Sequence, residues 1–154
     1  MSQVADDLAL LWSTSPLKAG GAALRRLEQL SLERDEISAH WEKFTKMLEH
    51  DNSYIRTRGL VLTARNARWM EADQVKAILE KYLACVTDPK PITARRCIQE
   101  LPFLLEGRPD LTERVEQRLR TADFTAYPDS MAPLVTKDTL EVLAWIDQSL
   151  KQNG

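Results

Sequence analysis

Apolar side chains recur along most of this chain at the spacing of one face of a helix. Ile37, Trp41, Phe44 and Leu48, for example, follow one another at intervals of four, three and four residues. Such spacing places the side chains on one side of an α-helix and predicts that this side is buried. No segment alternates apolar and polar residues beside an Asn-Gly or Asp-Gly turn, so we predict no β-sheet and an all-α fold. The predicted helices cover about residues 3–12, 17–30, 35–49, 53–69, 72–86, 91–106, 110–121 and 138–151.

A short polar turn recurs between the predicted helices. It occupies residues 51–59 and again residues 88–96, a spacing of 37 residues, and a looser copy occupies residues 13–21. Arrays of helix pairs are punctuated in this way, by one turn motif at a fixed period. We therefore predict a right-handed α–α superhelix, or α-solenoid, of about four antiparallel helix pairs. The apolar residues that follow the turns and open the next helix are Leu17, Ile55 and Ile92.

Length and composition fit one domain with a substantial core. Hydrophobic residues make up 44% of the 154 positions and charged residues 29%, so residues 1–154 are expected to form a single helical-repeat domain. Residues 121–137 contain two prolines and depart from the helical pattern. We expect residues 121–154 to form an atypical C-terminal cap, because a terminal repeat lacks a further neighbour. Phe124 and Tyr127 are expected to pack on the last layer of the core.

Charge and hydropathy exclude several classes of protein. The net charge of −2 disfavours nucleic acid as a partner, because such proteins neutralise phosphates over a broad basic surface. No apolar run reaches the ~18 residues that a membrane span needs, so no membrane partner is expected. Asp6 and Asp7 stand where a secretory signal would carry basic residues. These features together predict a cytoplasmic protein.

The chain contains no recognisable catalytic motif. Gly-x-Gly-x-x-Gly, a phosphate loop, Gly-x-Ser-x-Gly and Cys-x-x-Cys are all absent from it. His40 and His50 lack the His-Glu-x-x-His spacing of a zinc site, and we predict no metal. Cys85 and Cys97 are expected to be buried thiols rather than a disulfide. The sequence therefore predicts a protein that is not an enzyme and carries no cofactor.

The central turn resembles the HEAT repeat family and its armadillo-like relatives. The unit of that family is an antiparallel helix pair with an aspartate in its turn, then a β-branched, a basic and a small residue at set positions. Asp51, Ile55, Arg56 and Gly59 match these positions, and the resemblance covers about residues 13–120. It implies that Asp51 helps to cap the following helix. It also implies that Arg56 lies against the equivalent turn of a neighbouring unit.

The next copy of the turn departs from the family pattern. It keeps Asp88 and Ile92 but has Thr93 and Arg96 at the basic and small positions. The common role of the family is protein binding, and its second helices line a concave inner surface. The tail of the chain, with Asp129-Ser130-Met131 and Lys137-Asp138, also looks like that of small bacterial HEAT-like proteins sometimes labelled as iron–sulphur (SufBD) assembly proteins. Two cysteines, however, are fewer than the four ligands that a cluster usually takes.

Arginines on the helix after the central turn form a candidate binding surface. Arg58, Arg65 and Arg68 fall at positions i, i+7 and i+10, on one helix face with Trp69 beside it. In the 37-residue repeat, Arg95 occupies the place of Arg58. Arginine and tryptophan are enriched at interface hot spots, so we expect a binding or scaffold module for an acidic or amphipathic protein. The candidate contact residues are Arg58, Leu62, Arg65, Arg68, Trp69 and Arg95.

Four alternatives remain open from the sequence. The arginines could form a solvated surface paired with nearby acids. The HEAT-like family also includes DNA-alkylation glycosylases, and a relative of these would bind DNA. It includes bilin-chromophore lyases as well, which would imply a tetrapyrrole partner. A structural homo-oligomer is the fourth alternative. The acids named in the first alternative are Glu71, Glu100 and Glu106.

Overall fold

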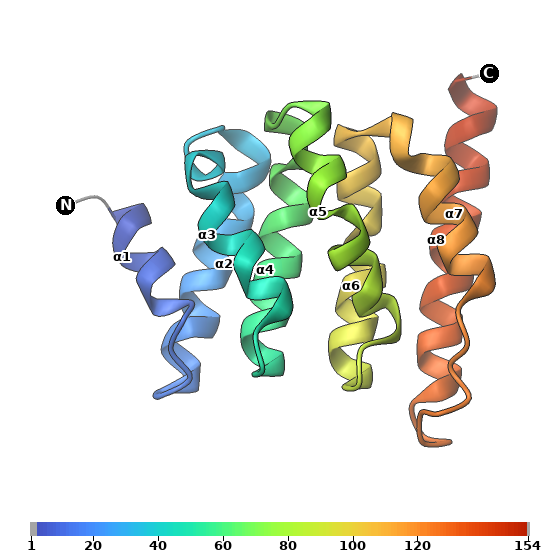
Figure 1. The fold of residues 1–154 in the computed structure, drawn as a ribbon, viewed down its shortest axis with the longest axis horizontal. Helices are drawn as coiled ribbons and strands as arrows, with labels where there is room; N and C mark the ends of the chain where they lie inside the picture. The colour runs from blue at the N-terminus through green and yellow to red at the C-terminus, as the bar shows by residue number, and fades with distance from the viewer. Residues whose placement is uncertain (1–2, 154) are drawn as a thin grey trace.

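The computed structural model describes residues 3–153, and within this range the chain is helical with no β-strand (Figure 1). The all-α fold class predicted from the sequence is thus confirmed. Short 3₁₀ segments extend or connect several helices, at Ile37–His40, Lys46–Glu49, Ala67–Trp69, Cys85–Thr87 and Pro109–Leu111. The α-helices are α1 (Gln3–Leu10), α2 (Leu17–Glu33), α3 (Trp41–Thr45), α4 (Ser53–Asn66), α5 (Ala72–Ala84), α6 (Pro91–Gly107), α7 (Thr112–Thr121) and α8 (Ala132–Asn153).

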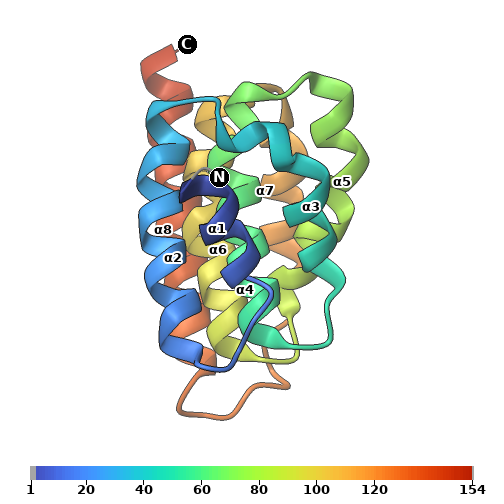
Figure 2. The same cartoon turned by 90° about the vertical axis from the view of Figure 1, so that its left-hand side faces the viewer.

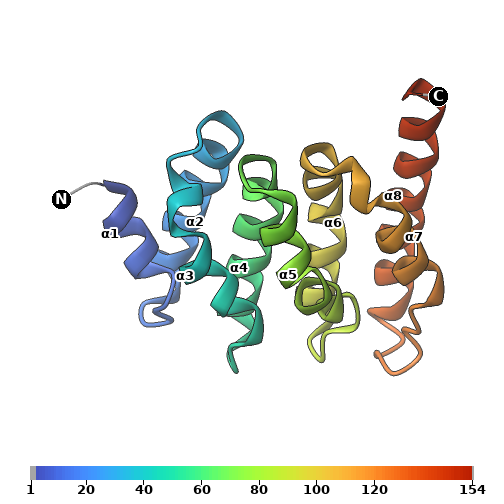
Figure 3. The same ribbon diagram turned by 45° about the horizontal axis from the view of Figure 1, so that its top comes forward.

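The helices are arranged in chain order along the long axis of the molecule. The chain advances from α1 at one end to α7 and α8 at the other (Figures 1 and 3). The even-numbered helices pack side by side, α2 against α4, α4 against α6 and α6 against α8. We call these four helices the inner row. Viewed along the array, α3, α5 and α7 lie on one side of the inner row (Figure 2).

One hydrophobic core runs through the array, and α4 lies at its centre. The core extends from Val4 of α1 to Ile146 of α8. Residues 60–64 of α4 are all fully buried, around the whole circumference of the helix. This follows from its neighbours, because α2, α3 and α6 all contact α4. A helix enclosed in this way carries apolar residues on every side rather than a single apolar stripe.

Local signals explain where the central helices begin. The Oδ1 atom of Asn52 accepts a hydrogen bond from the Tyr54 amide at 2.9 Å, so Asn52 caps α4. Asp51, which the family resemblance assigns to this role, is exposed in the turn. Helix α6 begins with Pro91, which suits the first position because that position needs no amide hydrogen.

Two of the predicted helices differ from the structure, one in where it begins and one in its continuity. The last helix begins at Ala132 rather than at residue 138, because Pro133 lies in its first turn, where a missing amide proton costs nothing. The helix predicted at 35–49 is interrupted at His40, whose backbone leaves the helical region with φ −103° and ψ 19°. Its apolar face is nevertheless buried as predicted, at Ile37, Trp41, Phe44 and Leu48.

The connection between α7 and α8 packs back onto the core. Phe124 and Tyr127 are partly buried against it, with their rings stacked 6.1 Å apart between centroids. The Tyr127 hydroxyl donates a hydrogen bond to the Asp88 carbonyl at 2.5 Å. The predicted packing of these two aromatic residues is therefore confirmed.

A buried carboxylate ties α1 to α2 and should make stability depend on pH. Asp7 accepts hydrogen bonds from Arg26 Nη2 at 2.7 Å and from Nε at 3.1 Å. The bonds from Arg26 hold the pKa of Asp7 below its ordinary value, although burial opposes them. An unfolded aspartate has a pKa of about 3.9. The ion pair therefore stabilises the fold above that pH, and its contribution is lost as the pH falls through the folded-state pKa.

We expect the unfolding free energy of the wild type to fall more steeply than that of Asp7→Asn as the pH is lowered from about 5 to about 2. Urea unfolding at several pH values measures both slopes. The matched control is Asp6→Asn, on an exposed position of the same helix. Parallel slopes for the wild type and Asp7→Asn would contradict the expectation.

Candidate functional site

The first residues of the predicted arginine surface lie inside the fold. Arg58 is 4% exposed, and its Nη1 donates to the carbonyls of Leu11 at 2.9 Å and Ser13 at 2.8 Å. Arg58 thereby holds the connection between α1 and α2 against α4. Leu62 is fully buried. Arg58 and Leu62, two of the predicted contact residues, therefore cannot present their side chains to a partner in this structure.

Arg65 belongs to an ion-pair network on the inner row. Its Nε lies 2.7 Å from Glu100 Oε1, and its guanidinium stacks 4.3 Å from the Phe103 ring centroid. Arg96 bridges Glu100 at 3.5 Å and Glu28 at 2.9 Å. Burial alone would lower the pKa of Arg65, but the hydrogen bond and charge of Glu100, with the charge of Glu28, raise it. The two positive and two negative groups of the network balance each other.

The remaining predicted contact residues are partly exposed but have partners. Arg68 Nη2 lies 3.6 Å from Glu106, and the Trp69 indole donates to the Ser31 carbonyl at 2.7 Å. Arg95 Nε lies 2.7 Å from Asp138 of α8, and the hydrogen bonds to Asp138 raise the pKa of Arg95. The predicted arginines thus lie along the inner row, yet most of their charge is balanced within the chain.

The turn segments 51–59 and 88–96 contact each other directly. Arg56 donates from Nε and Nη2 to the Asp88 carboxylate, both at 2.8 Å, and from Nη1 to the His50 carbonyl at 2.9 Å. Arg56 therefore lies against the next turn along the chain. Gly59 is buried where α4 packs on Met47.

A 37-residue spacing does not match equivalent positions of α4 and α6, because the starts of these two helices are 38 residues apart. Helix α4 begins at Ser53 and α6 at Pro91, and 91 minus 53 gives 38. Counted from the helix starts, buried Ile55 corresponds to buried Thr93, and Tyr54 corresponds to Ile92. Ile92 is accordingly 73% exposed, where the sequence predicted a repeat-turn residue like Ile55. By the same count Arg96, and not Arg95, is the counterpart of Arg58.

The exposed residues at these helix starts surround a groove of about 590 Å³, which we call the rim groove. Three large apolar side chains border it and remain exposed: Leu17 of α2 (39%), Tyr54 of α4 (55%) and Ile92 of α6 (73%). None of the described residues that line it is acidic. The full lining is Leu17, Gly21, Leu24, Ser53, Tyr54, Thr57, Arg58, Lys90, Pro91, Ile92, Thr93 and Met131.

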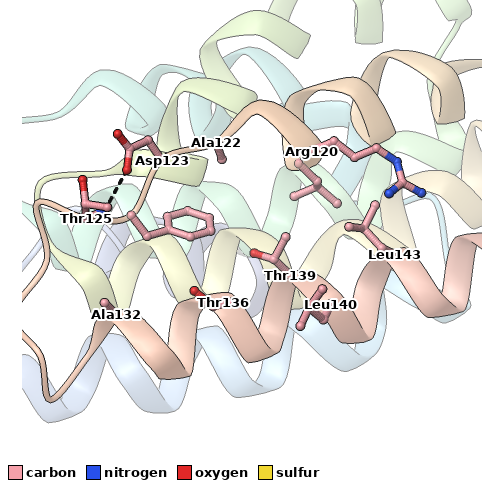
Figure 4. Close-up of a pocket in the computed structure, with 11 residues that line it drawn as sticks. Arg120, Ala122, Asp123, Thr125, Ala132, Thr136, Thr139, Leu140 and Leu143 are labelled. Atoms are coloured by element: carbon pink, nitrogen blue, oxygen red, sulfur yellow. Dashed lines mark hydrogen bonds between the residues drawn. The ribbon is translucent and has the colours of Figure 1, made fainter.

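A second groove, of about 540 Å³, lies at the end of the array between α7, the following loop and α8 (Figure 4). We call it the end groove. Leu140 and Leu143 of α8 contribute apolar surface, and Arg120 and Asp123 contribute opposite charges. The Asp123 carboxylate accepts a hydrogen bond from the Thr125 amide at 2.9 Å. Of the residues that line this groove, only Leu140 is a large apolar residue left mostly exposed.

The described residues offer little for metal or thiol chemistry. No group of three or more His, Cys, Asp and Glu side chains in residues 3–153 is placed to hold a metal ion. Both cysteines are buried free thiols, as predicted, and burial raises the pKa of Cys85 to about 12. In the same part of the chain, no helix is both long and apolar enough to span a bilayer.

No protein-family model, curated protein or solved structure matches this chain.

Proposed function

We propose that this chain is a non-catalytic, HEAT-like binding or scaffold module that holds a segment of a protein partner in the rim groove. The observation that carries this proposal is the convergence of exposed Leu17, Tyr54 and Ile92 around one groove. Scattered apolar residues are normal on a surface, but contiguous ones around a concavity mark binding sites. In this interpretation the helix pairs form an α-solenoid, and the chain-order packing of the inner row supports it.

The state of the arginines favours a protein partner over nucleic acid. A protein that binds DNA does so largely by neutralising phosphates with unpaired cations. Here Arg56, Arg65, Arg95 and Arg96 all lie within 3 Å of a carboxylate oxygen of the same chain. The surface that remains for recognition on the inner row is mainly apolar, as protein-binding grooves are. This part of the proposal keeps the predicted class of partner but moves its contacts from the arginines to the rim groove.

The test is affinity capture from a native lysate with quantitative mass spectrometry, comparing the wild type with a folded Ile92→Asp variant. The partner would bury the aspartate at position 92, and the apolar contact of Ile92 would be lost. Loss of such a hot-spot contact lowers the affinity by roughly thirtyfold or more. We therefore expect a partner protein that the wild type enriches and Ile92→Asp loses. The matched control is Leu150→Asp, also exposed but outside both grooves, which should capture like the wild type. Equal capture by all three proteins would refute the proposal. A further variant, Leu140→Asp, tests the end groove, and loss of the partner with this variant alone would move the site there.

A further inference from the structure

The rim groove carries positive charge that the chain itself does not balance. The exposed Lys90 and the buried Arg58 both line it. Arg58 cannot touch a partner directly and contributes only its charge, and neither residue forms an ion pair among residues 3–153. The Arg58 guanidinium binds only main-chain carbonyls, and burial without a carboxylate lowers its pKa. The nearest acid to Lys90 in the chain, Asp88, is already paired with Arg56. The groove therefore differs from the ion-pair network of Arg65 and Glu100, which is neutral.

Three helix starts add to this positive charge. Leu17, Ser53 and Pro91 are the first residues of α2, α4 and α6, and all three line the groove. The start of a helix carries a partial positive charge from its unpaired amides. Helix starts alone would not define a site, but here they surround the same apolar surface as the unbalanced Arg58 and Lys90.

From this charge complementarity we infer the chemistry of the occupant: a peptide segment with an apolar anchor residue and an adjacent aspartate or glutamate. The inference rests on the function proposed above. The apolar side chain would lie between Tyr54 and Ile92, the two most exposed apolar residues of the lining. The carboxylate would face Lys90 and the starts of α4 and α6, where it gains favourable electrostatic energy. A basic segment would meet like charge in the same place, so the groove should discriminate by sign.

The test selects ligands from a phage-displayed library of random twelve-residue peptides on the immobilised wild-type protein. Peptides whose binding is lost with Ile92→Asp occupy the rim groove, and we expect these to be enriched in aspartate and glutamate beside an apolar residue. Their affinity for Lys90→Glu should fall about fivefold and depend less on salt, because an exposed attraction is replaced by repulsion. Lys90 suits this change, because its contact with Asp88 uses the main-chain amide. The matched control is Lys151→Glu, an exposed lysine at the far end of α8, which should bind like the wild type.

The other outcomes distinguish the charge inference from the proposal that the rim groove is a binding site. Groove-binding peptides that are neutral or basic would overturn the charge inference while leaving the rim groove as a binding site. Selected peptides that bind Ile92→Asp as well as the wild type, or the recovery of no peptide, would overturn both.

Discussion

Replacing Glu100 with alanine is expected to lower the free energy of unfolding by about 3–5 kcal/mol. The Glu100 side chain is 5% exposed and accepts hydrogen bonds from Arg65 at 2.7 and 3.2 Å. Without it, the guanidinium of Arg65, itself 12% exposed, keeps its charge but loses its carboxylate partner. An uncompensated buried charge costs far more than the pair contributes, because water cannot solvate it. Urea unfolding followed by far-UV circular dichroism measures the loss.

The matched control is Glu80→Ala. Glu80 also joins two helices through an arginine, Arg114, with an oxygen–nitrogen distance of 2.6 Å, but both side chains are exposed. Water replaces the lost partner there, so the change in stability should be much smaller than for Glu100→Ala. Equal losses for the two variants would show that burial does not decide the cost of breaking these pairs.

Replacing Gly59 with alanine is expected to destabilise the protein by about 2–3 kcal/mol, although alanine is the better helix former. A Cβ atom on Gly59 would lie 2.6 Å from Met47 Cβ and 2.9 Å from the Phe44 carbonyl oxygen. Neither neighbour is the end of a flexible side chain, so α4 would have to move away from the 3₁₀ segment that contains Met47. Thermal and urea unfolding measure the effect.

The control is the same substitution at Gly21 in α2. There the nearest atom to a new Cβ is the Arg25 Nη1, at 3.9 Å, which is an ordinary contact. Gly21→Ala should therefore stabilise the protein by about 0.5–1 kcal/mol through helix propensity alone. If Gly59→Ala also stabilises the protein, the close packing of α4 does not limit side-chain size at this position.

Helices could be predicted from this sequence because a buried face leaves a local pattern. The spacing of Ile37, Trp41, Phe44 and Leu48 identified a buried face even where the backbone changes to 3₁₀ geometry. The interruption at His40 could not be predicted from the sequence, because a backbone that leaves the helical conformation at one residue hardly alters the spacing of the apolar residues.

The roles of the arginines could not be predicted, because their partners are distant in sequence. Arg65 and Glu100 are 35 residues apart, and Arg95 and Asp138 are 43 apart. Glu100 was named as a candidate partner only as one of several nearby acids. Arg58 donates to the main-chain carbonyls of Leu11 and Ser13. Because every residue has such a carbonyl, the amino-acid types at these positions give no sign of the contact.

The exposure of Ile92 was within reach of the sequence. Proline favours the first position of a helix, so Pro91 already marks the start of α6. Counting from Pro91 rather than from Asp88 puts Ile92 level with Tyr54, outside the buried face. The rim groove itself could not be predicted, since it depends on how the starts of α2, α4 and α6 align in space.

The pair between Glu28 and Arg96 has a consequence for how the molecule unfolds. In a stack of helix pairs, units normally contact only their neighbours and can open one at a time from an end. Glu28 on α2 and Arg96 on α6 are 68 residues apart and belong to helices on opposite sides of α4. Opening of the first unit would therefore also remove a partner from the third. Residues of α2, α4 and α6 should accordingly exchange their amide protons as one cooperative block.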